Sequence, residues 1–235
     1  TTLFRSRPKA VLLCDPSNPC GKVFTREELG IIAAYAEKYD TFVIVDEVYS
    51  QIIYKPYTYT YFSELPHMHD RTICVGSLSK TYSITGWRVG YILGPEAVID
   101  EIKKVHTFFT ISAPSPLQEA AVTGLRFGGD YYDGLVKTYT EKRDILMKGL
   151  DDLGLKHNIP QGAFYLLVDI SEFGYEKDTE FCEDLVRKVG VGSIPGSTFF
   201  AEDVQKYVRL HFAVNNETLY AALNRLESIR SKLSR

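Results

Sequence analysis

The sequence predicts an α/β protein with a mostly parallel sheet sandwiched by helices, followed by a smaller C-terminal α+β domain. In the first half of the chain, short apolar runs alternate with segments of helical periodicity. These runs, such as "TFVIV" at 41–45, show no alternation of polar and apolar residues. A strand without such alternation is typical of a parallel sheet that is covered on both faces.

The first predicted elements are a strand at 10–14, "AVLLC", a turn rich in Pro, Asn and Gly, and a helix. Thr25 and Glu28 form a capping box at the start of this helix, because each side chain can satisfy an otherwise free backbone N–H. The helix has one apolar face, made of Leu29, Ile32, Ala33 and Ala36.

The remaining elements of the first domain are predicted as strands at 41–45, 72–76 and 88–93 and a helix at 96–109. A long helical stretch follows at 131–153, and we place the domain boundary inside it, which gives domains at 7–135 and 136–235. In the second domain we expect a strand at 163–170, a helix at 179–189, a strand at 207–213 and a final helix from about Glu217.

The composition limits the function classes. The chain has 235 residues, with 27 Lys and Arg against 30 Asp and Glu, and the net charge of -3 predicts no basic surface for nucleic acid or membrane. We therefore expect a small-molecule or protein partner. The sequence contains neither a run that could span a bilayer nor a signal-peptide pattern, and its four cysteines form no CxxC pair. These features favour a cytoplasmic protein.

Thr1 to Ser6 resemble the translation of a sequencing adapter, so the predicted fold begins near Arg7.

Polar side chains follow three successive predicted strands, at the edge of a parallel sheet where ligands bind. They are Asn18 after the first strand, Asp46 and Tyr49 after the second, and Ser77, Ser79 and Lys80 after the third. Arg88 begins the next strand and can join this edge only if that strand runs antiparallel to the others. "FVIVDE" is also typical of P-loop NTPases, but the chain contains no matching G-x-x-x-x-G-K-[ST] motif.

The segments "NPCGKVFTREEL", "VDEVY", "SLSKTYSITGWRVGY", "PQGAFYLLVDI" and "YVRLHFA" together resemble the fold-type I pyridoxal-phosphate enzymes, specifically the class I/II aminotransferases. The resemblance covers the chain from about Lys9 and implies the fold of aspartate aminotransferase, pyridoxal 5'-phosphate as cofactor and a homodimer. It also implies that the N-terminal part of the family's sequence is missing here. Cys20 stands where many members of the family have threonine.

The resemblance implies a role for each candidate residue. Lys80 holds the cofactor as a Schiff base, and Asp46 pairs with its pyridine nitrogen. Tyr49 and Asn18 bind the phenolic oxygen of the cofactor, and its phosphate is bound by Ser77, Ser79 and Arg88. Arg209 with Asn18 binds the substrate carboxylate. The residue types suit these tasks, because a partly buried lysine can be a neutral nucleophile and a guanidinium matches a phosphate or a carboxylate. Strand alternation predicts that Glu47 points away from the cofactor and is structural.

The expected reaction moves an amino group between an L-amino acid and a 2-oxo acid. A carbon–sulfur lyase or a decarboxylase on the same scaffold, and the effector-sensing domain of a transcription regulator, remain as alternatives. The identity of the amino acid stays open. We expect no metal site, since His67 and His69 have no evident third ligand, and we expect the tyrosine-rich segment at 51–62 to pack rather than to line a substrate pocket.

Overall fold

The computed structural model describes residues 2–234, so residues 1 and 235, at the outer ends of the sequence, lie outside the description. Contacts between Cα atoms divide the chain into two compact units. Unit 1 contains the residues up to Pro16 together with Val23–Asp133, and unit 2 contains Ser17–Lys22 and the residues from Gly134 on. The domain boundary between residues 135 and 136 stays a prediction. The assignment of the short segment Ser17–Lys22 to unit 2 has no counterpart in the sequence analysis.

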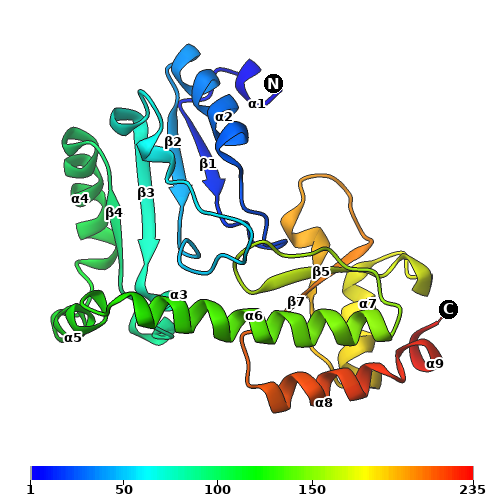
Figure 1. Ribbon diagram of the computed structural model, residues 1–235. Coiled ribbons are helices and arrows are strands. Elements are labelled where there is room, and N and C mark those ends of the chain that lie inside the picture. The colour runs from blue at the N-terminus through cyan, green and yellow to red at the C-terminus, as the bar shows by residue number, and fades with distance from the viewer. Residues whose placement is uncertain (1, 235) are drawn as a thin grey trace. The chain divides into compact units, whose positions relative to one another are not determined.

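Unit 1 contains a four-stranded sheet of β1 (Ala10–Cys14), β2 (Phe42–Asp46), β3 (Thr72–Ser77) and β4 (Gly90–Leu93), in that spatial order (Figure 1). The first three strands are parallel and β4 is antiparallel to β3. The sheet is therefore mostly parallel, as predicted. The fourth strand begins at Gly90 and not at Arg88, because Arg88 has a left-handed backbone with φ of 55°.

Six helices accompany this sheet in the chain. They are α1 (Thr2–Arg5), α2 (Arg26–Lys38), α3 (Leu78–Thr81), α4 (Glu96–Thr110), α5 (Ser115–Leu125) and α6 (Gly129–Asp152), whose C-terminal part belongs to unit 2. The capping box at the start of α2 is confirmed, because the Thr25 hydroxyl accepts from the Glu28 N–H and the Glu28 carboxylate accepts from the Thr25 N–H. α5 is an additional helix with no predicted counterpart. Single 3₁₀ turns occupy Phe62–Glu64, His69–Arg71 and Thr85–Trp87.

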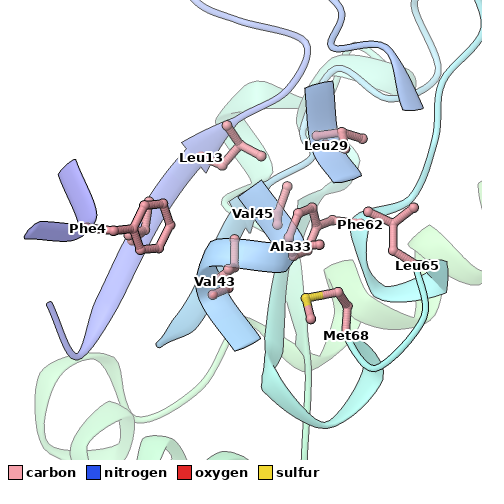
Figure 2. Packing of buried hydrophobic residues seen from close by; sticks show 11 residues of the cluster. Phe4, Leu13, Leu29, Ala33, Val43, Val45, Phe62, Leu65 and Met68 are labelled. Atoms are coloured by element: carbon pink, nitrogen blue, oxygen red, sulfur yellow. The ribbon is translucent and has the colours of Figure 1, made fainter. Parts of the chain in front are cut away.

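The main core of unit 1 lies between α2 and one face of the sheet (Figure 2). Leu29 and Ala33 of α2 pack with Val43 and Val45 of β2. Phe4, only 3% exposed, belongs to the same cluster and stacks on two tyrosines of α2. Beginning the fold near Arg7 was therefore wrong, because Phe4 supplies a large apolar side chain to this core.

The opposite face of the sheet is covered less completely. Leu12, in the middle of β1, is 72% exposed, and all four residues of β4 are exposed. The expectation that both faces of the strand at 41–45 are covered holds only in part, because the residues of β2 alternate between buried and half-buried. β3 is more fully buried than β2, whereas the outer strands β1 and β4 are more exposed. An edge strand has only one neighbouring strand, so its side chains have fewer packing partners than those of a central strand.

Unit 2 contains an antiparallel sheet of β5 (Tyr165–Asp169), β7 (Tyr207–His211) and the short β6 (Ile194–Pro195), in the order β5-β7-β6. Its helices are α7 (Asp178–Asp184), which continues as one π turn over Leu185–Val189, then α8 (Asn216–Leu226) and α9 (Ile229–Leu233). 3₁₀ turns lie at Ser171–Phe173 and Gly196–Phe199. Within residues 2–234, every helix is too short or too polar to cross a membrane.

The close pairing of β3 and β4 gives a test of the fold. A Cβ atom at Gly90 would lie 2.7 Å from the Gly76 carbonyl oxygen, and this backbone atom cannot move aside without breaking the pairing. We expect Gly90→Ala to lower the free energy of unfolding by roughly 1–3 kcal/mol in urea titrations. Gly86→Ala is the control, because a Cβ there meets nothing within 4 Å. An equal effect of both substitutions would contradict the pairing.

Candidate functional site

Asp46 and Tyr49 lie where β2 ends. Asp46 is opposite Val75 in the parallel pairing of β2 and β3, so its side chain starts from the same sheet edge as the end of β3. The Asp46 Oδ1 accepts a hydrogen bond of 3.2 Å from the Val48 N–H, which fixes the carboxylate against the turn. Asp46 is half-buried, whereas Tyr49 is only 4% exposed. The edge therefore offers one oriented carboxylate next to a buried phenol.

Ser77, Ser79 and Lys80 lie where β3 runs directly into α3. Ser77 is the N-cap of this short helix, and its Oγ accepts from the Ser79 N–H at 3.1 Å. This cap turns the chain immediately after the strand and places Lys80 one helical turn beyond the sheet edge. The side chain of Lys80 is half-buried, and Ser79 is 5% exposed.

Arg88 lies near the same edge, at the end of the segment that joins α3 to β4. The Leu78 N–H donates to the Val89 carbonyl at 3.2 Å, and Ser77 pairs with Gly90 across the antiparallel strands. β4 thus runs in the direction that the sequence analysis requires for Arg88 to join the edge. The Arg88 guanidinium is exposed and donates to the Thr85 carbonyl at 3.1 Å.

Tyrosines at the start of α6 support α3 from outside the sheet. The Tyr131 hydroxyl donates to the Thr81 carbonyl at 2.7 Å, which satisfies a carbonyl at the C-terminal end of α3. The hydroxyls of Tyr82 and Tyr132 lie 2.8 Å apart, and the rings of Tyr82 and Tyr131 stack at 5.7 Å. These contacts give the four-residue helix that carries Lys80 a rigid support.

Asn18 and Arg209 form a second set in unit 2. Arg209 is the central residue of β7, and its Nη1 donates to the Asn18 Oδ1 at 2.6 Å, although 191 positions separate the two residues. Val208 and Leu210 of β7 are buried, and Arg209 lies on the other face of the strand. The guanidinium is also in contact with two rings, with Tyr165 at 4.3 Å and Phe199 at 4.8 Å from their centroids.

The segment that carries Asn18 is tied into unit 2 by backbone and side-chain bonds. The Asn158 amide donates to the Cys20 carbonyl at 2.6 Å, and the N–H groups of Gln161 and Gly162 both donate to the Gly21 carbonyl at 2.8 Å. Gly21 has φ of 70°, and a Cβ there would lie 2.6 Å from the Gly162 oxygen. Only glycine fits this turn without strain.

Three contributors to this second set were not expected from the sequence, namely Asn158, Tyr165 and Phe199. The segment "PQGAFYLLVDI" indicates a strand at Tyr165, but nothing in it indicates a ring beneath an arginine. Asn158 stands in a loop and Phe199 ends a 3₁₀ turn, and neither position has a recognisable sequence pattern. Their roles depend on contacts with residues far away in the sequence.

Two ionisable groups next to the candidate residues have shifted pKa values. Burial and the nearby Arg209 charge lower the pKa of His211, which favours a neutral imidazole on the face of β7 that carries the guanidinium. Burial raises the pKa of Glu47 from its ordinary value to about 7. Glu47 is 7% exposed and immediately follows Asp46.

Comparison with known proteins assigns this arrangement to a family. The sequence profile described as "Aminotransferase class I and II" matches residues 2–226. The chain belongs to the class I and II aminotransferases. Members of this family use pyridoxal phosphate, and the recognition of the family from the sequence is confirmed.

Individual aminotransferases match over nearly the whole chain. Methionine aminotransferase of Escherichia coli is 36% identical over 228 residues, covering 97% of this chain and 59% of that protein. Kynurenine–oxoglutarate transaminase 1 of Homo sapiens is 32% identical over 252 residues, covering 98% and 60%. The structure of N-succinyldiaminopimelate aminotransferase from Mycobacterium tuberculosis superposes with a TM-score of 0.90 at 30% identity, covering 94% and 58%. The chain therefore spans about three fifths of the length of these relatives, and the aspartate-aminotransferase-like fold is confirmed.

The side chains at the sheet edge of unit 1 fit the family's cofactor. A carboxylate suits the pyridine nitrogen of pyridoxal phosphate, a lysine amine suits its aldehyde, and a guanidinium with serine hydroxyls suits its phosphate. Asp46, Lys80, Ser77 and Arg88 supply these groups at one edge. These four residues are thus of the chemical types that the cofactor requires.

The anchoring of the Asn18 segment can be tested through Asn158. Asn158→Asp keeps the oxygen that accepts from the Leu167 N–H at 2.7 Å but replaces the donor to the Cys20 carbonyl with a second acceptor. We expect urea unfolding to show a loss of roughly 1–3 kcal/mol, because a half-buried carbonyl loses its partner and faces a negative charge. The exposed Asn224→Asp serves as the control. If the two variants unfold alike, Asn158 does not hold this segment.

Proposed function

We propose that the protein containing this chain is a pyridoxal-phosphate-dependent aminotransferase that moves an amino group between an L-amino acid and a 2-oxo acid. The observation that carries the proposal is the meeting of Asp46, Lys80 and Arg88 at one sheet edge in a chain of the class I and II family. The three relatives described above are named as aminotransferases or transaminases, which supports this reaction over a lyase or decarboxylase activity.

In this proposal the sheet edge of unit 1 binds the cofactor. Arg88, Ser77 and Ser79 hold its phosphate through charge-assisted and hydroxyl hydrogen bonds. Asp46 keeps its pyridine nitrogen protonated, and the hydrogen bond from Val48 orients the carboxylate for this task. Tyr49 binds its phenolic oxygen, and the contact of Asn18 with the cofactor stays a prediction. When bound, the cofactor supplies an electron sink for the bond that breaks at the substrate Cα.

Lys80 has two tasks in the proposed reaction. Its amine would hold the cofactor covalently, and once a substrate amine has taken its place, the free Nζ would accept the proton from the substrate Cα and pass it on. A single positioned amine can serve both half-reactions, since the second is the reverse of the first. The short α3, capped by Ser77 and supported by Tyr131, restricts the motion of this amine.

Arg209 and Asn18 bind the substrate carboxylate in this proposal. The Asn18 oxygen occupies one N–H of the guanidinium, which leaves further N–H groups for two parallel bonds to a carboxylate. Contact with the rings of Tyr165 and Phe199 keeps the guanidinium in one plane. Neutral His211 adds no competing positive charge beside it. The homodimer and the cytoplasmic location stay predictions.

Replacement of Lys80 tests the proposed attachment point. We expect Lys80→Ala to abolish the absorbance band of the lysine-bound cofactor and to lower turnover by at least about a thousandfold, since one group supplies both attachment and proton transfer. Lys104→Ala, on the exposed surface of α4, is the matched control and should behave like the native protein. A Lys80→Ala protein that keeps both the band and the turnover would overturn the assignment. Release of ammonia and pyruvate in place of the exchanged oxo acid and amino acid would instead indicate a lyase.

Replacement of Arg209 tests the carboxylate site. Arg209→Lys keeps the charge but loses the two-pronged geometry, so kcat/KM for both amino-acid and oxo-acid substrates should fall by at least roughly tenfold, about 1.4 kcal/mol. Cofactor content should not change. Arg187→Lys provides the control, because Arg187 is an exposed arginine of unit 2 that pairs with Glu183. Loss of cofactor, or normal turnover of both substrates, would exclude Arg209 as the carboxylate ligand.

A further inference from the structure

Asp178 is a buried acid of unit 2 that the proposed reaction does not use. It lies in the first turn of α7 and is 0% exposed. Among the described residues of unit 2, it is the only charged residue that is buried. A carboxylate removed from water is costly unless hydrogen-bond donors replace the lost water. The donors that Asp178 meets therefore indicate what its burial achieves.

Ser197 supplies a donor to each oxygen of this carboxylate. The Asp178 Oδ2 accepts from the Ser197 main-chain N–H at 2.7 Å, and Oδ1 accepts from the Ser197 hydroxyl at 2.8 Å. Hydrogen bonds to an ionised acceptor are stronger than those between neutral groups. The Asp178 N–H itself donates to the Gln205 Oε1 at 3.3 Å. The start of α7 is thus tied by two bonds to the 3₁₀ turn Gly196–Phe199.

The same turn lies directly on β7. A Cβ atom at Gly196 would be 2.5 Å from the Tyr207 carbonyl oxygen, so the two backbones are in close contact there. β6, which ends where the turn begins, pairs with β7. The first residue of the turn is therefore fixed by β7, and the second residue, Ser197, is fixed by Asp178.

Phe199 is the last residue of this turn and contacts the guanidinium of Arg209. Its ring centroid lies 4.8 Å from the Arg209 Cζ, within the range of a cation–π contact. The ring of Tyr165 makes the second contact at 4.3 Å, and strand pairing in β5 holds that ring. Phe199 belongs to a four-residue turn whose own N-cap, Pro195, supplies no side-chain hydrogen bond. The position of Phe199 thus depends on the bonds that Asp178 makes.

We propose that Asp178 is a positioning residue that keeps the ring of Phe199 against the guanidinium of Arg209. It does so through its two bonds to Ser197. The consequence for substrate binding rests on the proposed function, in which Arg209 binds the substrate carboxylate, but the consequence for the ring does not. A guanidinium that is already held in one orientation loses less conformational freedom when a carboxylate binds. Asp178 thereby strengthens the binding of amino acids and oxo acids without contacting them.

Two substitutions of Asp178 test this role in the holoenzyme, with the L-amino acid that the native protein turns over fastest. Asp178→Ala removes both bonds to Ser197, so KM should rise about fivefold with kcat nearly unchanged, because the ground state and the transition state lose the same binding. Asp178→Asn can keep both bonds, since its amide oxygen can accept from the N–H and its amide N–H can donate to the hydroxyl. Its KM should stay within about twofold of the native value.

Leu185→Ala is the control for lost stability. Leu185 directly follows α7 and is 2% exposed in the apolar interior, so its truncation lowers stability without removing a bond to the turn. Asp178→Ala alone should have the raised KM at a temperature at which both variants are folded. A raised KM in both would assign the effect to general destabilisation and contradict the proposal. Ser197→Ala, which loses only the hydroxyl bond, should raise KM less and replaces Asp178→Ala if that variant does not fold.

Phe199→Leu tests the route by which Asp178 acts. Phe199→Leu should raise KM by itself, and adding Asp178→Ala should bring little further rise, because substitutions that remove the same contact are not additive. A full further rise of about fivefold in the double variant would show that Asp178 acts by another route, and the proposal would be wrong.

A crystal structure of the Asp178→Ala holoenzyme tests the proposal without any activity. The Phe199 centroid should lie more than about 6 Å from the Arg209 Cζ, beyond cation–π contact, whereas in Leu185→Ala it should stay near the native 4.8 Å. An unmoved ring would overturn the proposal. If the ring moves but neither Asp178→Ala nor Arg209→Lys changes KM, the positioning of the ring is supported and only the proposed function of Arg209 fails.

Discussion

The hydrogen-bond register of β2, β3 and β4 is the constraint on which the candidate site depends. Parallel pairing sets Asp46 opposite Val75, and antiparallel pairing sets Gly90 opposite Ser77, so three strand ends meet at one edge. A shift of one residue in either pairing would turn the alternating side chains to the other face of the sheet. The register is fixed in turn by burial, since Val43 and Val45 must face α2 in the core. The position of the polar edge is thus a consequence of apolar packing.

The polar side chains at this edge are oriented by short-range bonds that use the strand ends themselves. Ser77 caps α3, and Asp46 accepts from the backbone of its own turn. These bonds cost little conformational freedom because the groups are close in sequence. The set in unit 2 is built differently, because Arg209 is oriented by Asn18, Tyr165 and Phe199 from three separate segments. Preorganisation of this second kind requires that the whole unit be folded.

Asp46 and Glu47 show how adjacent carboxyls acquire different tasks from their surroundings. Asp46 is half-buried, and its carboxylate accepts a hydrogen bond from the Val48 N–H. Glu47 is 7% exposed, and burial raises its pKa to about 7. The assignment of Glu47 as a structural residue stays a prediction.

The sequence by itself determined the fold class, the family and most elements of the two units. The strand at 10–14 and the capping box of α2 were predicted to the residue, because apolar runs and helix caps depend on neighbours within a few positions. The strand-end rule also predicted that polar groups gather at one edge, although the roles of the individual residues stay predictions. Tertiary structure alone decided that Phe4 belongs to the core, that Asn158 holds the Cys20 carbonyl, and that Asn18 meets Arg209. Asn158 and Cys20 are 138 positions apart, and Arg209 and Asn18 are 191 positions apart. No local pattern encodes such a bond, because its geometry exists only after distant segments have packed together.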